Sequence, residues 1–390
     1  MLDIETLPVL KKAIGDRARA DKKLLEDLRY DVRLFTGSVR SIQRRSTTAV
    51  SLVASDGGNN KLVFDPFFVQ LVRVTDSYGK ELCLDVVSPT TDTDELSKNQ
   101  FYPDGTPRTA LGKMMAGLGV NPPLLSQLCH MIPKGKDIRE HPEKVKPHWV
   151  LEYRDLCEWA VLYDRICNYT FGTDTLIVRD GLLRSKIFRG EYFIKWRHDI
   201  EDAIKRIYQQ DKRRIYLVGI AKHSKVIDRY RLAMAIEGIF SSGDARYVRV
   251  PREIEKKAYI WQEYARGAEV EEEEGQVTER PKFVAGDMFL VRFGSRSGDP
   301  IWAIDIFSSQ SDKAAEIFGY LLSDSIEGFP VPFYPLCLQK AHEYAEIVDF
   351  DLEIFQDEIF SAVRDILPHE KREIVDAWRL NSDLSSRRYE

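Results

Sequence analysis

The order of strand-like and helix-like segments is the feature that most restricts the fold of this chain of 390 residues. From residue 47 to about residue 87, apolar runs rich in β-branched and aromatic residues follow one another, separated by Gly, Asn or Pro. Such runs are typical of an antiparallel meander. Beyond residue 148 the pattern becomes strand, helix, strand, helix, which indicates parallel strands joined by helices.

The later elements can be placed by residue range. We expect a helix over 149–168, the strand "TLIVRD" (175–180), a helix near 196–212, the strand "RIYLVGIAK" (214–222), a helix near 224–239, the strands "MFLVRFG" and "PIWAIDIF", and helices from about residue 335. A three-stranded meander followed by such units predicts an α/β fold: a ribonuclease-H-like mixed sheet with flanking helices, plus helical N- and C-terminal extensions. In such a sheet the first strand lies beside the fourth.

Composition divides the chain further. Residues 1–45 are predicted as a helical segment, 46–350 as the sheet domain and 351–390 as a second helical segment. Residues 88–148 are rich in Pro, Gly, Thr and Asp and are predicted as an insertion, with a short helical patch near 109–129. Residues 267–281 are acidic and almost free of apolar side chains, so we expect a solvated loop there.

Charge and cysteine usage limit the partners and the compartment. A net charge of −5 gives no general basic field for nucleic acid, so a partner would have to supply one. We expect no signal peptide, because the N-terminus is acidic and lacks an apolar core, and no membrane span, because no run approaches about 18 apolar residues. The five cysteines are scattered without CxxC spacing, which argues against a disulfide framework and a zinc site and favours the cytoplasm.

Two apolar runs end in Asp-Gly: "SLVASDGG" (51–58) and "TLIVRDGLL" (175–183). Each Asp-Gly is either a tight turn or one half of a shared site in which Asp56 and Asp180 stand at neighbouring strand ends. In the second interpretation the two carboxylates repel unless a divalent cation lies between them, and oxygen ligands favour Mn²⁺ or Mg²⁺. Glycine after each Asp would then leave room for a metal-bound phosphate.

A third acid is expected on the helix over 149–168, and two candidates remain. A helical wheel places Glu152 on the apolar face and Glu158 at its polar margin. We predict Glu158, because a metal ligand must lie where water and substrate reach it; the alternative is that either residue is an ordinary solvated charge. Lys222 follows a strand end, where its ammonium could meet a phosphate, although most lysines lie on the surface.

Four stretches resemble, in order, motifs of the NurA nucleases, which pair with HerA-type hexameric DNA translocases. They are "VASDGG", "RDLCEW" ahead of "LIVRDGLL", "VGIAKHSK" and "FYPLCLQKAH", and they extend from residue 47 to 347. Asp-Gly-Gly stands where that family more usually has Asp-Gly-Ser. The resemblance implies a metal-dependent deoxyribonuclease, of the 5′–3′ exonuclease and single-strand endonuclease type. Its metal, Mn²⁺ or Mg²⁺, would be held by Asp56, Glu158 and Asp180.

The same resemblance implies further catalytic residues and partners. Lys222 and His342 would neutralise or protonate developing charge, and Tyr334 would position the strand by stacking or a hydrogen bond. The partners would be DNA, a HerA-like hexameric ATPase and a second copy of the chain in a homodimer, with no membrane. The rival interpretation is a catalytically inactive scaffold of the same fold that binds the ATPase. An RNA-directed nuclease, the polarity of cleavage and the choice between repair and anti-phage defence stay open.

Overall fold

A nine-stranded mixed sheet forms the centre of the computed structural model, which describes residues 6–46, 50–64, 67–241, 243–259, 268–273, 276–346 and 349–372. The strand order is β1-β7-β10-β11-β6-β5-β2-β3-β4. The strands are β1 (Arg40–Ser41), β2 (Val50–Phe64), β3 (Phe67–Asp76), β4 (Glu81–Val87), β5 (Asp174–Asp180), β6 (Ile215–Ala221), β7 (Arg246–Arg249), β10 (Gly286–Arg292) and β11 (Trp302–Phe307). β5 is parallel to both β2 and β6, and the other neighbours are antiparallel. The predicted α/β fold, with a mixed sheet and flanking helices, is confirmed.

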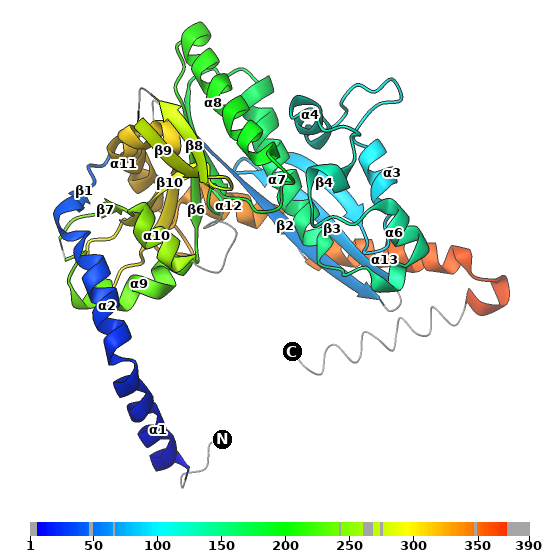
Figure 1. Cartoon of the computed structure of the whole chain (residues 1–390). Coiled ribbons are helices and arrows are strands. Elements are labelled where there is room, and N and C mark those ends of the chain that lie inside the picture. The colour runs from blue at the N-terminus through cyan, green and yellow to red at the C-terminus, as the bar shows by residue number, and fades with distance from the viewer. Residues whose placement is uncertain are drawn as a thin grey trace.

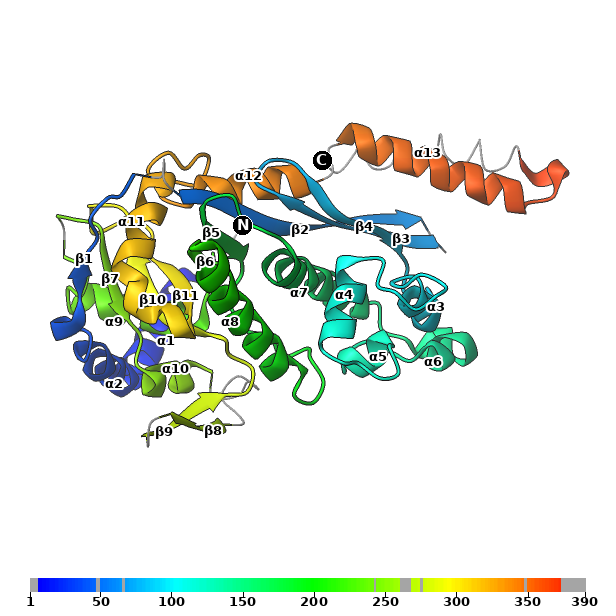
Figure 2. The same cartoon turned by 90° about the horizontal axis from the view of Figure 1, so that it is seen from above.

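Helices cover both faces of this sheet (Figure 2). The longer ones are α1 (Leu7–Ala20), α2 (Lys22–Arg33), α7 (Trp149–Asn168), α8 (Tyr192–Asp211), α9 (Lys225–Ile236), α11 (Ala314–Ser325), α12 (Leu336–Ala345) and α13 (Asp349–Ile366). Successive strand residues face opposite sides: Ile177 packs in the core cluster that contains α7, whereas Val178 packs in the cluster with α11 and α12. Residues of β5 with even numbers therefore face α12.

The insertion over 88–148 is folded onto α7. It holds α3 (Thr93–Lys98), α4 (Ala110–Gly117), α5 (Leu125–Leu128) and α6 (Gly135–Glu140), which is more than the single helical patch predicted. Leu96, Met114 and Leu128 belong to the same apolar core as α7. The insertion therefore helps to fix the helix that carries both candidate glutamates.

β2 is longer than predicted, and this excludes a turn at the first Asp-Gly. Asp56, Gly57 and the residues up to Phe64 continue in one strand, paired with β3 from Thr75 to Phe67. The parallel partner β5 ends at Asp180, but the antiparallel partner β3 continues beyond that point and keeps β2 extended. β2 ends at Phe64, eight residues beyond Asp56, and β3 begins at Phe67.

Other predictions of local structure also need correction. The N-terminal helical segment ends before β1, whose two residues pair with β7, a strand that was not predicted. α11 was not predicted either. In place of the predicted acidic loop, β8 (Ala268–Glu273) and β9 (Gln276–Pro281) pair as antiparallel strands. Residue 267 and residues 274–275 of that segment, like 47–49 of the first predicted strand and 373–390 of the C-terminal segment, lie outside the described residues.

The two terminal helices lie at the edges of the molecule. α1 buries no residue and projects away from the sheet (Figure 1). α13 lies along the meander, where Phe355 and Ile359 pack against Leu71 of β3. In the part of the chain that the structure describes, none of the helices has the length and apolar character needed to cross a membrane.

Candidate functional site

Asp56 and Asp180 lie side by side because β2 and β5 are neighbours in parallel register. Their last paired residues are Ser55 and Arg179, so the next residue on each strand is one of the two aspartates. Each aspartate comes two residues after Ala54 or Val178 and therefore points to the same face of the sheet, which α12 covers. Asp180 also ends β5, where Gly181 takes a φ of +107° and the chain turns away. Asp180 is thus at a strand end, as predicted, and Asp56 is inside a strand.

α12 adds His342 to the two aspartates. Its Nδ1 lies 2.6 Å from Oδ2 of Asp56, and one ligand atom from each of Asp56, Asp180 and His342 lies within 4.8 Å of the others. The helix begins at Leu336 after Pro335, so His342 falls two turns along it, as predicted. Thr75 of β3 donates a hydrogen bond of 3.0 Å to the carbonyl of Ala341 and holds this part of α12 on the sheet.

Lys222 and Tyr334 both contact Asp180. Lys222 comes directly after β6, and its Nζ lies 3.2 Å from Oδ2 of Asp180. The Tyr334 hydroxyl donates to Oδ1 of the same carboxylate at 3.3 Å. The Tyr334 ring is completely buried and packs on Trp302, with 4.9 Å between ring centroids. A buried ring cannot stack on a DNA base, so the predicted stacking role is wrong for this structure.

Burial shapes the electrostatics of this group. Burial first, and then the neighbouring Asp56 charge, raise the pKa of Asp180, while the Lys222 ammonium lowers it. Burial also raises the pKa of Tyr334 well above its usual value, helped by the charges of Asp180 and Asp56. His342 is 58% exposed and forms the open side of the cluster. The site is a pair of mutually repelling carboxylates, with the partly exposed side chains of His342 and Lys222 beside them.

Glu158 approaches Asp56 from the opposite face of the sheet. Gly57 alternates with Asp56 along β2 and faces α7, which carries Glu158. A Cβ at position 57 would lie 2.3 Å from Oε1 of Glu158. The Glu158 carboxylate thus fills the space that a side chain at position 57 would need. This contact explains the glycine more directly than the predicted room for a phosphate.

Two arginines hold the Glu158 carboxylate. Arg179 donates from Nη2 to Oε2 at 3.1 Å, and Arg154 lies 3.4 Å from Oε1. Burial raises the pKa of Glu158 to about 8, with Arg179 acting against it and Asp155 and Asp56 adding to it. Around Asp56, the described residues that group within ligand distance of each other are Asp56, Asp180 and His342, and Glu158 is outside that group. As a metal ligand it stays a prediction.

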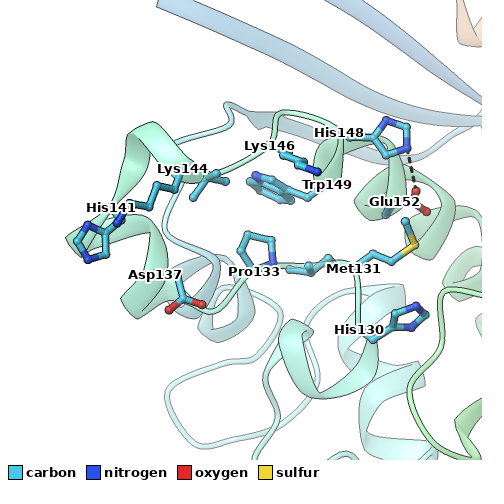
Figure 3. A pocket seen from close by; sticks show the side chains of 12 residues that line it. His130, Met131, Pro133, Asp137, His141, Lys144, Lys146, His148, Trp149 and Glu152 are labelled. Atoms are coloured by element: carbon cyan, nitrogen blue, oxygen red, sulfur yellow. Dashed lines mark ion pairs between the residues drawn. The ribbon is translucent and has the colours of Figure 1, made fainter.

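Glu152 lies elsewhere on α7. Its Oε1 is 3.2 Å from Nε2 of His148, and both residues line a cavity of about 510 Å³ between α7 and the insertion (Figure 3). His130 and His141 line the same cavity, which has no part in the aspartate cluster. Of the two candidate glutamates, the structure places Glu158 beside Asp56.

Arg179 is the main residue of the site that the sequence analysis missed. It faces α7 from β5, donates to Asp155 at 2.6 Å as well as to Glu158, and stacks on Trp159 at 4.2 Å. The sequence feature that could have identified Arg179 is its position inside an apolar strand, because a charged side chain there requires buried partners. Arg184, in the basic run over 184–189, is likewise buried and paired with Asp305 and Glu255.

The donor set is suited to a divalent cation. Two carboxylates and an imidazole supply oxygen and nitrogen, whereas the sequence analysis assumed oxygen alone. Mn²⁺ accepts such a mixed set more readily than Mg²⁺, which prefers oxygen and water. A cation would also relieve the repulsion between Asp56 and Asp180 that raises the pKa of Asp180.

Fold and site together define an α/β protein with an acidic candidate metal centre at adjacent strands of a mixed sheet. Neither a protein-family model nor a curated protein sequence matches the chain. Among solved structures, the NurA nuclease from Sulfolobus solfataricus is similar at 13% identity and a TM-score of 0.41, over 93% of this chain and 99% of that one. A NurA structure bound to dAMP and manganese is similar at 12% identity and a TM-score of 0.37, over 96% and 100%. At these values the likeness carries no argument about function.

Proposed function

We propose that the chain is a metal-dependent nuclease that hydrolyses DNA phosphodiesters. The observation that carries this proposal is the grouping of Asp56, Asp180 and His342 within 4.8 Å, on neighbouring strands, with a lysine beside them. Such a group suits a divalent cation next to an anionic substrate. The order of the four motifs that resemble NurA nucleases supports the same class of reaction.

Each residue has a proposed task. Asp56 and Asp180 bind the cation, with His342 completing the set, and the bound cation would lower the pKa of a water molecule and balance charge on the phosphate. Lys222, already within reach of the site, pairs with a phosphate oxygen as negative charge develops there. Tyr334 and His342 hold the carboxylates of Asp180 and Asp56 in place. Glu158, on the far side of Gly57, is the third acid of the proposed site.

We further propose that the chain acts with a HerA-type hexameric ATPase, as a homodimer, in DNA end processing or defence. The net charge of −5 supports a partner that delivers DNA, because strong binding to DNA depends on many neutralised phosphates. The five free cysteines are consistent with a reducing compartment such as the cytoplasm.

The test is cleavage of labelled DNA and RNA by the purified chain with Mn²⁺, Mg²⁺ or EDTA. We expect Mn²⁺-dependent cleavage of DNA that EDTA abolishes. Asp56→Asn and Asp180→Asn should each reduce the rate by at least ~100-fold, because each removes a ligand. Both variants should stay folded, since the loss of one negative charge relieves repulsion.

Circular dichroism and thermal melting of the two variants provide the control for folding. Cleavage at the wild-type rate by either folded variant would contradict the shared metal site. Cleavage of RNA in preference to DNA would change the substrate class. The absence of activity under every condition, with or without the ATPase, would leave the inactive scaffold as the function.

A further inference from the structure

A second group of metal-ligating side chains lies between β4 and α7, on the opposite face of the sheet from the Asp56 and Asp180 carboxylates. Cys83 and Asp85 share one face of β4, two residues apart, and Cys157 lies on the α7 surface that faces this strand. One ligand atom from each of these three residues lies within 4.8 Å of the others. Cys83 and Cys157 are 74 positions apart and look scattered in the sequence, but they are neighbours in the fold.

The distance between the two β4 ligands is close to that of two ligands around one small cation. Sγ of Cys83 lies 3.9 Å from Oδ2 of Asp85. Two ligands on a tetrahedral zinc ion, with Zn–S of about 2.3 Å and Zn–O of about 2.1 Å, are about 3.6 Å apart. Movements of a few tenths of an ångström would thus bring Cys83 and Asp85 onto one ion. Cys157 is fully packed in the core, and its position is fixed by the helix.

Neighbouring residues orient the Asp85 carboxylate, and the adjoining cavity leaves space for a fourth ligand. The Tyr153 hydroxyl, one turn before Cys157, donates to Oδ2 of Asp85 at 2.6 Å. Such an outer hydrogen bond is typical of metal-ligating carboxylates. All three candidate ligands line a cavity of about 360 Å³ that also contains Arg108. The cavity has room for a water molecule as fourth ligand, and the arginine balances the excess charge of two thiolates and a carboxylate around a divalent ion.

We propose that Cys83, Asp85 and Cys157 form a second metal site, selective for a thiophilic divalent cation such as Zn²⁺. Two sulfur ligands favour zinc over the Mn²⁺ or Mg²⁺ that suits the Asp56 and Asp180 site. On binding, the two thiol protons leave for solvent and two metal–sulfur bonds form. The bound ion would link β4 to α7 through Cys157, the residue directly before Glu158. This proposal goes beyond the nuclease function and does not depend on it.

The test uses Co²⁺ as a spectroscopic probe for zinc, added to the full chain carrying Asp56→Asn and Asp180→Asn. These changes remove the carboxylate site, so that bound metal reports on the cysteines. We expect a thiolate-to-cobalt charge-transfer band that saturates at about one equivalent and disappears when Zn²⁺ is added. Cys83→Ser and Cys157→Ser should each abolish the band.

Cys167→Ser is the matched control, because Cys167 lies on the same helix and its Sγ contacts the carbonyl of Asp199 instead. The control should keep the full band. As a second measurement, Zn²⁺ should raise the Tm of the protein that has Cys83 but not of the Cys83→Ser variant. The proposal is overturned if no thiolate band forms, if the band survives Cys83→Ser, or if thiol counting and mass spectrometry find a Cys83–Cys157 disulfide in place of bound metal.

Discussion

Gly57 separates the two faces of the candidate site and leaves space for the Glu158 carboxylate. Asp56 points to α12 and Glu158 comes from α7, and only the absence of a side chain at position 57 lets the Glu158 carboxylate approach the strand. A methyl group there would meet Oε1 at 2.3 Å. That contact is far too short, so Glu158 would have to move.

We expect Gly57→Ala to displace Glu158, lower nuclease activity and destabilise the fold by about 1–3 kcal/mol through overpacking. In a Glu158→Ala background the methyl group has space, so the same substitution should cost less than about 1 kcal/mol. Urea denaturation of the four proteins gives the coupling free energy. Gly37→Ala is the control, because a Cβ at that position has nothing within 4 Å. Additive effects at positions 57 and 158 would contradict the contact.

Glu158→Gln and Glu152→Gln separate the two candidate acids. Glu158→Gln should reduce Mn²⁺-dependent cleavage at least ~10-fold, whereas Glu152→Gln should change the rate little and stability by about 0.5 kcal/mol or less. The reverse pattern of rates would identify Glu152 as the acid of the site.

Glu158 also predicts a dependence of stability on pH in EDTA. Its pKa of about 8 in the folded protein lies above the ordinary 4.5, so the folded state binds this proton more tightly than the unfolded chain. Stability therefore falls as the pH rises from about 4.5 to about 8. Glu158→Gln should remove this part of the decline and be relatively more stable above pH 8. Identical slopes for the wild type and the variant, measured by urea denaturation, would show that the group does not titrate in this range.

Among the elements, β11 is tied to the segment after β5 by a buried ion-pair network. Asp305 of β11 is completely buried and accepts two hydrogen bonds from Arg184, of 2.7 and 2.8 Å, and one of 3.1 Å from the backbone of Leu183. Arg184 also pairs with Glu255 of α10 (Arg252–Ala258) at 2.5 Å. The network fixes the chain just after Asp180 and Gly181.

Asp305→Asn should destabilise the protein by about 3 kcal/mol, because it leaves the buried Arg184 with one carboxylate instead of two. Thermal melting and urea denaturation measure the loss. Asp312→Asn, at an exposed position shortly after β11, is the control and should change stability by less than about 0.5 kcal/mol. Equal stabilities of Asp305→Asn and the wild type would mean that the network contributes nothing net to folding.

The whole molecule has too little positive charge to hold DNA firmly by itself. With 57 basic and 62 acidic residues, we expect weak binding that decreases steeply as salt rises. A HerA-type ATPase with ATP should then stimulate degradation of long duplex DNA far more than that of short single strands, because only the duplex needs to be driven into the site. Gel assays with both substrates measure this ratio. Equal stimulation, or none, would rule out delivery of DNA by the ATPase.

Local sequence patterns were sufficient for most strands and helices and for two residues of the site. The helix over 149–168 and the strand ending at Asp180 are present as predicted. The order of elements was enough to bring Asp56 beside Asp180, because a meander followed by parallel units permits few sheet orders. These features depend on the periodicity of apolar residues and on the order of the elements, and both can be read from residues that are close together in the sequence.

Only the tertiary structure decided which side chains meet across different elements. The passage of β2 through Asp56 depends on pairing with β3, the position of Glu158 depends on how α7 packs on Gly57, and the burial of Tyr334 depends on Trp302. The grouping of Cys83 with Cys157 likewise depends on the packing of α7 against β4. These contacts are set by strand register and helix packing, which arise from the whole core and leave no periodic signal in the sequence.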